Sequence, residues 1–363
     1  MRFRKCPDKK EIYSMKGNRK RTSGPTMTAI AEQLGISQST VSKALRGATD
    51  LNPETAAKVR RAAEEMGFDT AHISNKVNCR QSIGVVFMEL CSEYYNGIFS
   101  AFSAAIEARG FKAVTMLADF NDEKKQEECI KYLARLRVSG ILFLTELDFS
   151  ADRIRKPLQK YGVPAVIISR MTRVDFCDVI SVNHSVGVEM GVDELFRLGH
   201  RKIAFVGDEF TQRRERAFRD TVQRLGLSVP DCYTVSDCGR YCKGGYEAAR
   251  KLFALPPSER PSACFAAYDH LAYGILRAAR EAGIRIPEDF SVIGVDDNQV
   301  SDYIAPRLST IRMPVEEVGR QASDMLLARI DGSTAPFSTI FLTPKLIRRD
   351  STAENHSTEV QKP

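Results

Sequence analysis

The sequence has no apolar run that approaches the roughly eighteen residues needed to span a membrane as a helix. The pattern of a secretory signal is missing too, because no apolar segment follows the charged N-terminal residues. Nine cysteines are scattered from Cys6 to Cys264 without a CxxC pair, and no histidine lies at ligand spacing from the nearest group, Cys232, Cys238 and Cys242. We therefore expect a cytoplasmic protein with no membrane partner, no disulfide framework and no metal site.

Signatures of nucleotide-using and hydrolytic enzymes are absent as well. The sequence contains no GxSxG, no phosphate loop of the GxxxxGK[ST] type and no GxGxxG. These motifs expose a nucleophile or cradle phosphates at the start of a helix. We therefore expect neither an enzyme nor a bound cofactor.

The 363 residues exceed the length of one ordinary domain, and 43% hydrophobic with 27% charged residues is the balance of a folded globular protein. The formal net charge of +7 is carried by residues 1–25, which hold nine basic and two acidic side chains, so the remaining chain is formally neutral. Such an arm can attract phosphates without sequence preference. It is equally consistent with a disordered extension, or with translation that starts at Met15 or Met27.

Two short helices joined by a tight turn begin the predicted fold. Thr26 or Thr28 can cap a first helix, and Gly35 supplies the turn that ends it. Ser37 can cap a second helix over residues 38–45, which turns its apolar side chains inward and its polar side chains outward.

A third helix is predicted from Asn52, which is followed by proline and glutamate, to Met66. The three helices make up a small unit, residues 26–68. A helix-turn-helix can place its second helix in the DNA major groove, where amides and hydroxyls meet base edges and lysines meet phosphates. A three-helix bundle that binds no nucleic acid would use the same caps and apolar stripes.

The run TMTAIAEQLGISQSTVSKALRG at residues 26–47, with its TVSxxLxG signature, resembles the N-terminal domain of the lactose-repressor (LacI/GalR) family of bacterial transcription regulators. NPET at 52–55 and AAEEMGF at 62–68 match the family's third helix and the start of its hinge. By that resemblance, Gln38, Ser39 and Lys43 read operator bases or their flanking phosphates. The full set of implied DNA contacts is Thr26, Ser37, Gln38, Ser39, Thr40, Ser42, Lys43, Arg46 and Val77.

Residues 69–80 correspond to the family's hinge but match it less well. Thr70 and Ala71 stand where proline and asparagine are usual, and Val77 stands where a leucine usually wedges into the minor groove. A β-branched side chain can also unstack a base step, although it is shorter than leucine. Alternatively, Ile73 and Val77 make an apolar contact between the hinge helices of two subunits. The two interpretations do not exclude each other.

From residue 81 onward, apolar runs alternate with helical stretches. Strands are predicted at 83–87, 112–117, 140–144, 164–169, 202–206, 233–235, 262–266 and 290–295. Helices are predicted at 94–109, 123–136, 151–161, 185–198, 213–225, 243–255 and 269–282. The alternation predicts an α/β fold with two lobes, each a doubly wound parallel sheet, and a ligand cleft where the carboxyl ends of the strands meet.

Four strings of this second module also match the family: LGHRKIAFVG at 198–207, IPEDFSVIGVDD at 286–297, LSTI at 308–311 and a PVEELG-like helix start at 314–319. By resemblance, residues 81–348 form a two-lobed domain like that of periplasmic sugar-binding proteins. The chain is then expected to cross between the lobes near Asn183, Ile311 and Ile340. Residues 349–363 are expected to form a disordered tail.

The resemblance also supplies candidates for contacts with an effector, namely Tyr94, Tyr95, Arg170, Arg214, Tyr268 and Asp296. An arginine that faces a carboxylate across a cleft gives directional, charge-assisted bonds to a polar ligand. Arg214 and Asp296 also have simpler interpretations, as a surface helix residue and as a turn residue after a strand. Tyr268 stands where the family usually has asparagine, which suggests a ligand with a flat or apolar face, or a different sugar.

These inferences combine into one prediction: a homodimeric or tetrameric repressor that binds double-stranded operator DNA and responds to a sugar-like effector between its lobes. A catabolite regulator controlled by a phosphocarrier protein is the alternative within the family. Outside the family, the alternatives are a dinucleotide-using enzyme with a DNA-binding head, which turnover of a cofactor would reveal, and a transport-type binding protein, which would lack the helical head.

Overall fold

The computed structural model describes residues 26–45, 51–68, 81–120, 122–145, 151–169 and 174–355. It divides the chain into two compact units, Met1–Asn78 and Cys79–Pro363. Within the described ranges, no helix combines the length and the apolar character needed to cross a membrane. Outside those ranges lie the N-terminal arm and several predicted hinge and site residues, which are 69–80 with Val77, Arg46 and Arg170.

The N-terminal unit contains three helices, α1 (Met27–Leu34), α2 (Gln38–Leu45) and α3 (Pro53–Glu65). The predicted caps are confirmed, because side-chain oxygens of Thr26, Ser37 and Asn52 accept hydrogen bonds from backbone N–H groups at 3.2, 3.2 and 2.8 Å. Gly35 ends α1 in the left-handed conformation, with φ of 63°. Each helix therefore begins where a short polar side chain can satisfy its first free N–H groups.

Apolar side chains at helical spacing meet between these three helices. Ile30 of α1, Val41 of α2 and Val59 of α3 are fully buried at the centre of the cluster. Each such burial contributes about 1.5–3 kcal/mol relative to an exposed side chain. The small unit thus has an apolar core of its own.

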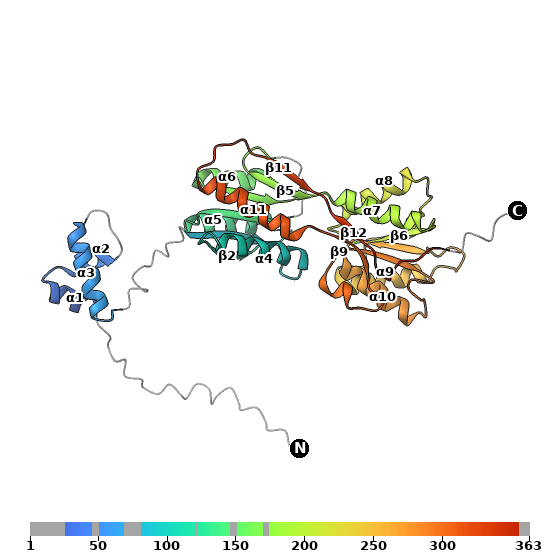
Figure 1. The fold of residues 1–363 in the computed structure, drawn as a ribbon, viewed down its shortest axis with the longest axis horizontal. Coiled ribbons are helices and arrows are strands. Elements are labelled where there is room, and N and C mark those ends of the chain that lie inside the picture. The colour runs from blue at the N-terminus through green and yellow to red at the C-terminus, as the bar shows by residue number, and fades with distance from the viewer. Residues whose placement is uncertain are drawn as a thin grey trace, which may run out of the picture. The chain divides into compact units, whose positions relative to one another are not determined.

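The first lobe of the second unit, where Figure 1 labels β2, β5 and β11, is a parallel sheet with strand order β11-β5-β4-β3-β1-β2. Its strands are β1 (Ser82–Phe87), β2 (Lys112–Leu117), β3 (Gly140–Leu144), β4 (Ala165–Ile168), β5 (Asp178–Val182) and β11 (Thr339–Leu342). Two helices pack together on one face, α4 (Glu93–Glu107) and α11 (Val315–Ile330). The opposite face is covered by α5 (Glu123–Arg135) and α6 (Ala151–Tyr161).

The second lobe is a sheet with strand order β12-β10-β9-β8-β6-β7. Its strands are β6 (Ile203–Val206), β7 (Thr234–Val235), β8 (Ala263–Ala266), β9 (Ser291–Asp296), β10 (Ser309–Arg312) and β12 (Lys345–Ile347). Its helices are α7 (His184–Arg197), α8 (Gln212–Arg224), α9 (Tyr241–Phe253) and α10 (Asp269–Glu281). The predicted pair of doubly wound lobes is confirmed, with one difference: β12 runs antiparallel to β10.

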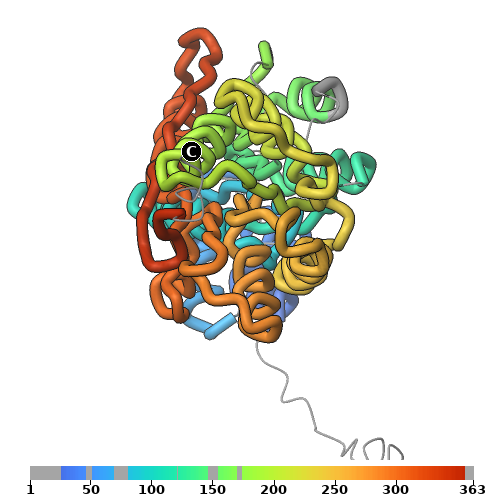
Figure 2. Tube along the Cα trace, turned by 90° about the vertical axis from the view of Figure 1, so that its right-hand side faces the viewer, coloured from blue at the N-terminus to red at the C-terminus, as the bar shows by residue number. Residues whose placement is uncertain are grey.

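That difference follows from the path of the chain between the lobes. The chain passes from one lobe to the other three times: after β5 at Asn183, between β10 and α11 at Met313, and between β11 and β12 at Thr343. It leaves β10 at the end of the strand next to the first lobe and returns to the same end. The returning strand β12 must therefore run in the opposite direction. In Figure 2 the red C-terminal segment extends along one side of the two-lobed unit.

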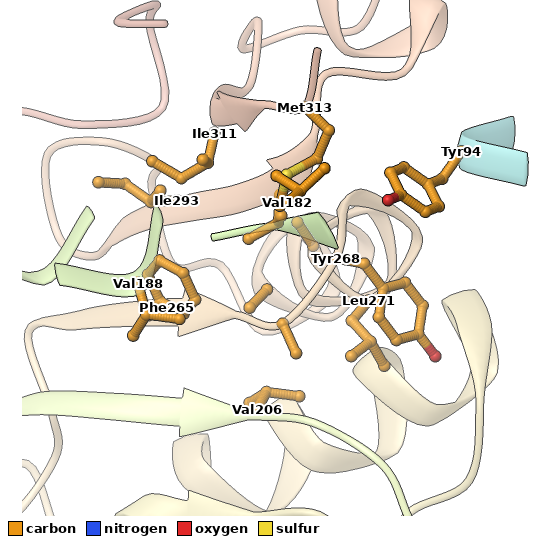
Figure 3. Close-up of a cluster of buried hydrophobic side chains, with 14 of the residues drawn as sticks. Tyr94, Val182, Val188, Val206, Phe265, Tyr268, Leu271, Ile293, Ile311 and Met313 are labelled. Carbon is orange, nitrogen blue, oxygen red and sulfur yellow. The ribbon is translucent and has the colours of Figure 1, made fainter. Parts of the chain in front are cut away.

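The apolar core is continuous across these crossings. Val182 at the end of β5 and Met313 just after β10 belong to one buried cluster, which also contains Tyr94 of the first lobe and Phe265 of the second (Figure 3). Packed protein interiors resist continuous deformation. We therefore expect the lobes to change their angle by repacking side chains at the crossings rather than by free rotation about loose linkers.

The C-terminal segment corrects one expectation. Residues 349–363 were expected to form a disordered tail, and this is wrong for residues 349–355, which the structure describes. Ser351 is fully buried, and its hydroxyl donates to the backbone carbonyl of Val292 in β9 at 2.6 Å. The segment is ordered because it hydrogen-bonds along the second sheet, a long-range pairing that local sequence patterns do not reveal.

A buried histidine joins this segment to the second lobe by hydrogen bonds, and it makes the stability of the folded chain depend on pH. The ring of His200 bonds to the hydroxyl of Ser262 at 2.9 Å and to the carbonyl of Ala353 at 3.2 Å. Burial lowers the pKa of His200 from 6.5 to about 4. Between these two values the unfolded chain binds a proton that the folded chain does not, so stability falls as pH drops through this window.

We expect His200→Gln to flatten the loss of thermal stability between pH 6.5 and pH 4, because glutamine keeps polar groups at the site but does not titrate. The check is Tm measured in small pH steps for wild type and variant. Parallel curves for the two proteins over this window would contradict the expectation.

Candidate functional site

The second helix of the N-terminal unit presents a polar face. Gln38, Ser39 and Lys43 are exposed on α2. At the start of the helix, the hydroxyl of Ser37 lies 2.7 Å from that of Ser39 and 2.8 Å from that of Thr40. These bonds fix the first turn, so the helix offers amide, hydroxyl and ammonium groups from set positions. This is the chemistry with which a helix reads base edges and contacts phosphates.

Some of the residues predicted to contact DNA also stabilise the helical unit itself. Thr26 and Ser37 cap α1 and α2, and Ser42 is half-buried. Arg46 and Val77 lie outside the described residues. The roles of all these residues on DNA stay predictions.

A cleft lies between the two lobes at the carboxyl ends of β1, β2 and β6 to β9. It is open to solvent, and the space between its walls, mouth included, is about 620 Å³. The first lobe supplies side chains from the start of α4, and the second supplies side chains from the starts of α8, α9 and α10. Five of the six predicted effector contacts line this cleft, namely Tyr94, Tyr95, Arg214, Tyr268 and Asp296.

Arg214 is a buried cation at the floor of the cleft, 5% exposed. Its Nη1 donates to the carbonyl of Ala267, and its Nη2 donates to Nδ1 of His184 at 3.0 Å. Its Nε is buried and has no hydrogen-bond partner among the described residues. The interpretation of Arg214 as a surface helix residue is therefore wrong, because α8 turns this side chain inward.

Tyr268 and Asp208 form a polar pair on the cleft wall that belongs to the second lobe. The hydroxyl of Tyr268 donates to Oδ2 of Asp208 at 2.7 Å and accepts from the backbone N–H of Tyr241 at 2.9 Å. Burial, followed by the nearby charge of Asp208, raises the pKa of Tyr268. Its hydroxyl is therefore a permanent donor that holds the Asp208 carboxylate in place.

One carboxylate reaches across the cleft. Glu89, just after β1 in the first lobe, accepts from Nη1 and Nη2 of Arg240 at 2.8 and 3.3 Å. It also accepts from the hydroxyl of Tyr241 at 2.7 Å. Because Arg240 and Tyr241 belong to the second lobe, these three bonds join the two walls of the cleft.

Aromatic rings surround the polar groups. The rings of Phe120 from the first lobe and Phe210 from the second lie 5.2 Å apart, centre to centre. Arg240 lies 4.8 Å from the ring of Phe210 and 4.7 Å from that of Tyr241. A cation near an aromatic ring is attracted electrostatically to the ring face. The aromatic side chains therefore stabilise the position of this guanidinium and also line the cleft.

Backbone strain marks the end of β9. Asp296 has φ of 110° and Asp297 has φ of 59°, both in a region that non-glycine residues seldom adopt. Such conformations cost about 1–3 kcal/mol each and gather at ligand-binding sites. The turn leaves Asp296 on the cleft wall, whereas Asp297 forms ion pairs with Arg312 and Arg349 at 2.5 and 2.7 Å.

A buried carboxylate fixes the start of α10. Asp269 is fully buried and accepts from the hydroxyls of Thr310 and Ser301 at 2.6 and 2.7 Å and from the backbone N–H of Asn298 at 2.8 Å. Burial raises its pKa to about 7, although the three hydrogen bonds act in the opposite direction. This network positions its neighbour Tyr268 on the cleft wall.

Helices α9 and α10 touch backbone to backbone. A Cβ atom at Gly245 would lie 2.0 Å from the carbonyl oxygen of Leu271, and one at Gly274 would lie 2.0 Å from that of Cys242. No side chain can be inserted here without separating the helices. The residues at their first turns are therefore carried to the cleft as one block.

Sequence reasoning missed several residues of the cleft. Each follows closely after a strand, and all belong to the lining, namely Glu89, Phe120, Asp208, Phe210, Arg240 and Tyr241. Listing the polar and aromatic residues after each predicted strand would have found them, because the carboxyl ends of parallel strands meet at one edge. The completed cleft offers carboxylates and guanidinium groups between aromatic faces, an arrangement that binds a polar small molecule by directed hydrogen bonds.

Comparison with known proteins agrees with both units. Residues 26–70 match the family of bacterial regulatory proteins called the lacI family, and residues 192–352 match the periplasmic binding protein-like domain. The ribose operon repressor of Escherichia coli (strain K12) is 28% identical over 333 residues, which is 90% of this chain and 99% of that protein.

Two solved structures extend the likeness. A LacI family transcriptional regulator from Enterococcus faecium with bound ribose is 26% identical, has a TM-score of 0.67, and covers 76% of this chain and 99% of its own. The complex of the transcriptional regulator CelR with cellobiose is 27% identical, has a TM-score of 0.66, and covers 90% of this chain and 99% of its own. With both units matched, the chain combines a DNA-binding domain of the lacI family of bacterial regulatory proteins with a periplasmic binding protein-like domain.

Proposed function

We propose that the protein is a cytoplasmic, sequence-specific DNA-binding repressor, not an enzyme, whose operator affinity is set by a sugar-like effector in the cleft. The observation that carries this proposal is the convergence of Tyr94 and Tyr95 from one lobe with Arg214, Tyr268 and Asp296 from the other. A ligand that touches both lobes binds one lobe angle better than another and so shifts the equilibrium between them.

The relatives support the class of ligand. The solved structures of the Enterococcus faecium regulator and of CelR hold ribose and cellobiose, and one relative is a ribose operon repressor. We further propose that the protein acts as a homodimer on an operator with two half-sites, as helix-turn-helix regulators do. Residues 69–80 would then carry the change of lobe angle to the helical units.

A thermal-shift screen tests the effector part of the proposal. The full chain is heated with sugars, sugar acids, nucleosides and purines, and a binder raises Tm because it stabilises the folded state by RT ln(1 + [L]/Kd). Each binder is then added to an operator-binding assay. A set of binders that leaves operator affinity unchanged would count against control by the cleft.

For the DNA face, we expect Gln38→Ala to weaken binding to the preferred operator by about 10- to 100-fold and to relax base preference, because a good amide–base pair gives about 1–3 kcal/mol of discrimination. Lys43→Ala should instead weaken all sequences alike and lower the salt dependence by about one phosphate contact. Binding-site selection and titrations at several salt concentrations measure both effects.

Lys58→Ala is the matched control for these variants, since Lys58 is an exposed lysine on α3 rather than on α2. It should keep the selected sequence of the wild type. If wild type, Gln38→Ala and Lys43→Ala all selected the same sequences, α2 would not be the helix that reads bases.

A further inference from the structure

Glu89 occupies a site that is fully built by the opposite lobe. Its carboxylate is met by two guanidinium N–H groups of Arg240 and by the hydroxyl of Tyr241. The Glu89 and Arg240 side chains are 16% and 26% exposed, so the pair is largely withdrawn from solvent. Three donors and no acceptor converge on one point, which is the pattern of an anion site.

The donors are held by groups other than Glu89. Behind Arg240, its Nε lies 3.4 Å from Oδ2 of Asp208, and the ring of Phe210 lies against the guanidinium. Tyr241 has φ of 59°, and its backbone N–H is fixed by the hydroxyl of Tyr268. All of these partners belong to the second lobe. The site therefore stays assembled when Glu89 leaves.

The geometry fits a carboxylate, which the Glu89 side chain already places there. The planar fork of a guanidinium matches the two oxygens of a carboxylate, and the phenol adds a third bond. Elsewhere the cleft offers acceptors, because Asp208, Asp296 and Glu93 line it. Carboxylates accept hydrogen bonds from hydroxyl groups. One end of the cleft thus fits an acid group, and the rest fits hydroxyls.

We propose that Arg240 and Tyr241 form a carboxylate subsite which Glu89 fills in the ligand-free chain, and that the effector is a small polyhydroxylated carboxylic acid whose acid group displaces Glu89. The inference rests on the proposed function and specifies its ligand. Glu89 acts as an internal competitor, so the apparent affinity of the effector is reduced by the fraction of molecules in which Glu89 holds the subsite. Displacement of Glu89 also breaks its hydrogen bonds to Arg240 and Tyr241, which join the two lobes.

Chemical rescue tests the subsite directly. The full-length Glu89→Ala variant is unfolded thermally in increasing sodium acetate, with sodium chloride at the same ionic strength as reference. Acetate should raise the Tm of Glu89→Ala with saturation, because it fills the vacated subsite. Wild type should respond much less, since Glu89 competes. Adding Arg240→Leu to Glu89→Ala should remove the response.

Glu93→Ala is the matched control, because Glu93 is a carboxylate of the same lobe and the same cleft whose neighbour is His270 at 3.9 Å. It should show no acetate response beyond that of the wild type. An acetate response in Glu89→Ala equal to that of wild type or of Glu93→Ala would overturn the subsite.

The class of effector is tested with pairs of aldonic acid and parent aldose, such as D-gluconate with D-glucose and D-ribonate with D-ribose. Glu89→Gln weakens the internal competitor, so the acid of a pair should bind it about tenfold more tightly than it binds wild type. The aldose should bind both proteins alike. Equal behaviour of every acid and its aldose, including no binding by either, overturns the acid assignment. Failure of the wild type to bind any operator DNA would instead count against the proposed function.

Discussion

Replacing Arg214 with alanine is expected to abolish the effector's influence on operator binding while leaving operator affinity without effector within about threefold of the wild-type value. Arg214 is a buried cation on the lining of the cleft, and we have proposed that it contacts the effector. Its truncation removes a charge-assisted contact and leaves ligand acceptors unpaired in the cleft, at a cost of about 2–5 kcal/mol in binding.

The measurement is operator affinity titrated with an effector found in the screen, for wild type, Arg214→Ala and Arg216→Ala. Arg216 is an exposed arginine two positions along the same helix, so it controls for loss of charge on α8. Arg214→Lys keeps a cation in the cleft and should retain a weakened response. A full effector response in Arg214→Ala would remove this residue from the binding site.

Loss of the Asp269 carboxylate should produce the largest loss of stability that we predict. In Asp269→Ala, a backbone N–H and two hydroxyls lose their acceptor in a buried site. Each unsatisfied buried donor costs about 1–3 kcal/mol, so the free energy of unfolding should fall by several kcal/mol. Denaturant unfolding measures this, with Asp289→Ala as control, because Asp289 is an exposed partner of Arg285.

The same residue gives a second, pH-dependent readout. Because burial raises the folded pKa of Asp269 to about 7 from 3.8, the folded state keeps a proton that the unfolded state has lost between these values. Its contribution to stability therefore decreases as pH rises from about 4 to 7. Asp269→Asn does not titrate and should lack this part of the slope. An unchanged slope in Asp269→Asn would show that the carboxyl is not protonated in the folded state.

Local patterns in the sequence were enough to predict the helical unit and the main strands. The cap at Ser37 and the apolar run of β1 depend on residues next to each other in the chain, so they are visible without the fold. The strands β5, β10, β11 and β12 were not part of the predicted alternation. Of these, β11 pairs with β5, far earlier in the sequence. Such pairing depends on the path of the chain rather than on local composition.

The residues of the cleft likewise divide into those that the sequence predicted and those that only the folded structure reveals. Arg214 and Asp296 were predicted through resemblance to a family, but the contact between Glu89 and Arg240 joins residues 151 positions apart. Neither residue stands in a recognisable motif, and each alone has the pattern of a solvated charge. The burial of Asp269 was not predicted, because it depends on hydroxyls of η4 (Gln299–Asp302) and β10. Long-range polar networks of this kind need the folded structure to be seen.

The last crossing between the lobes bears on how the protein is made. The ribosome delivers the chain from its N-terminus, and β11, the edge strand beside β5, is supplied only by residues 339–342. The helix that packs against α4, α11, is also synthesised after most of the second lobe. The first lobe therefore lacks one edge strand and one of the two helices on this face until nearly the whole protein has been synthesised. Apolar surface left exposed during that interval is the kind of surface through which incompletely folded chains aggregate.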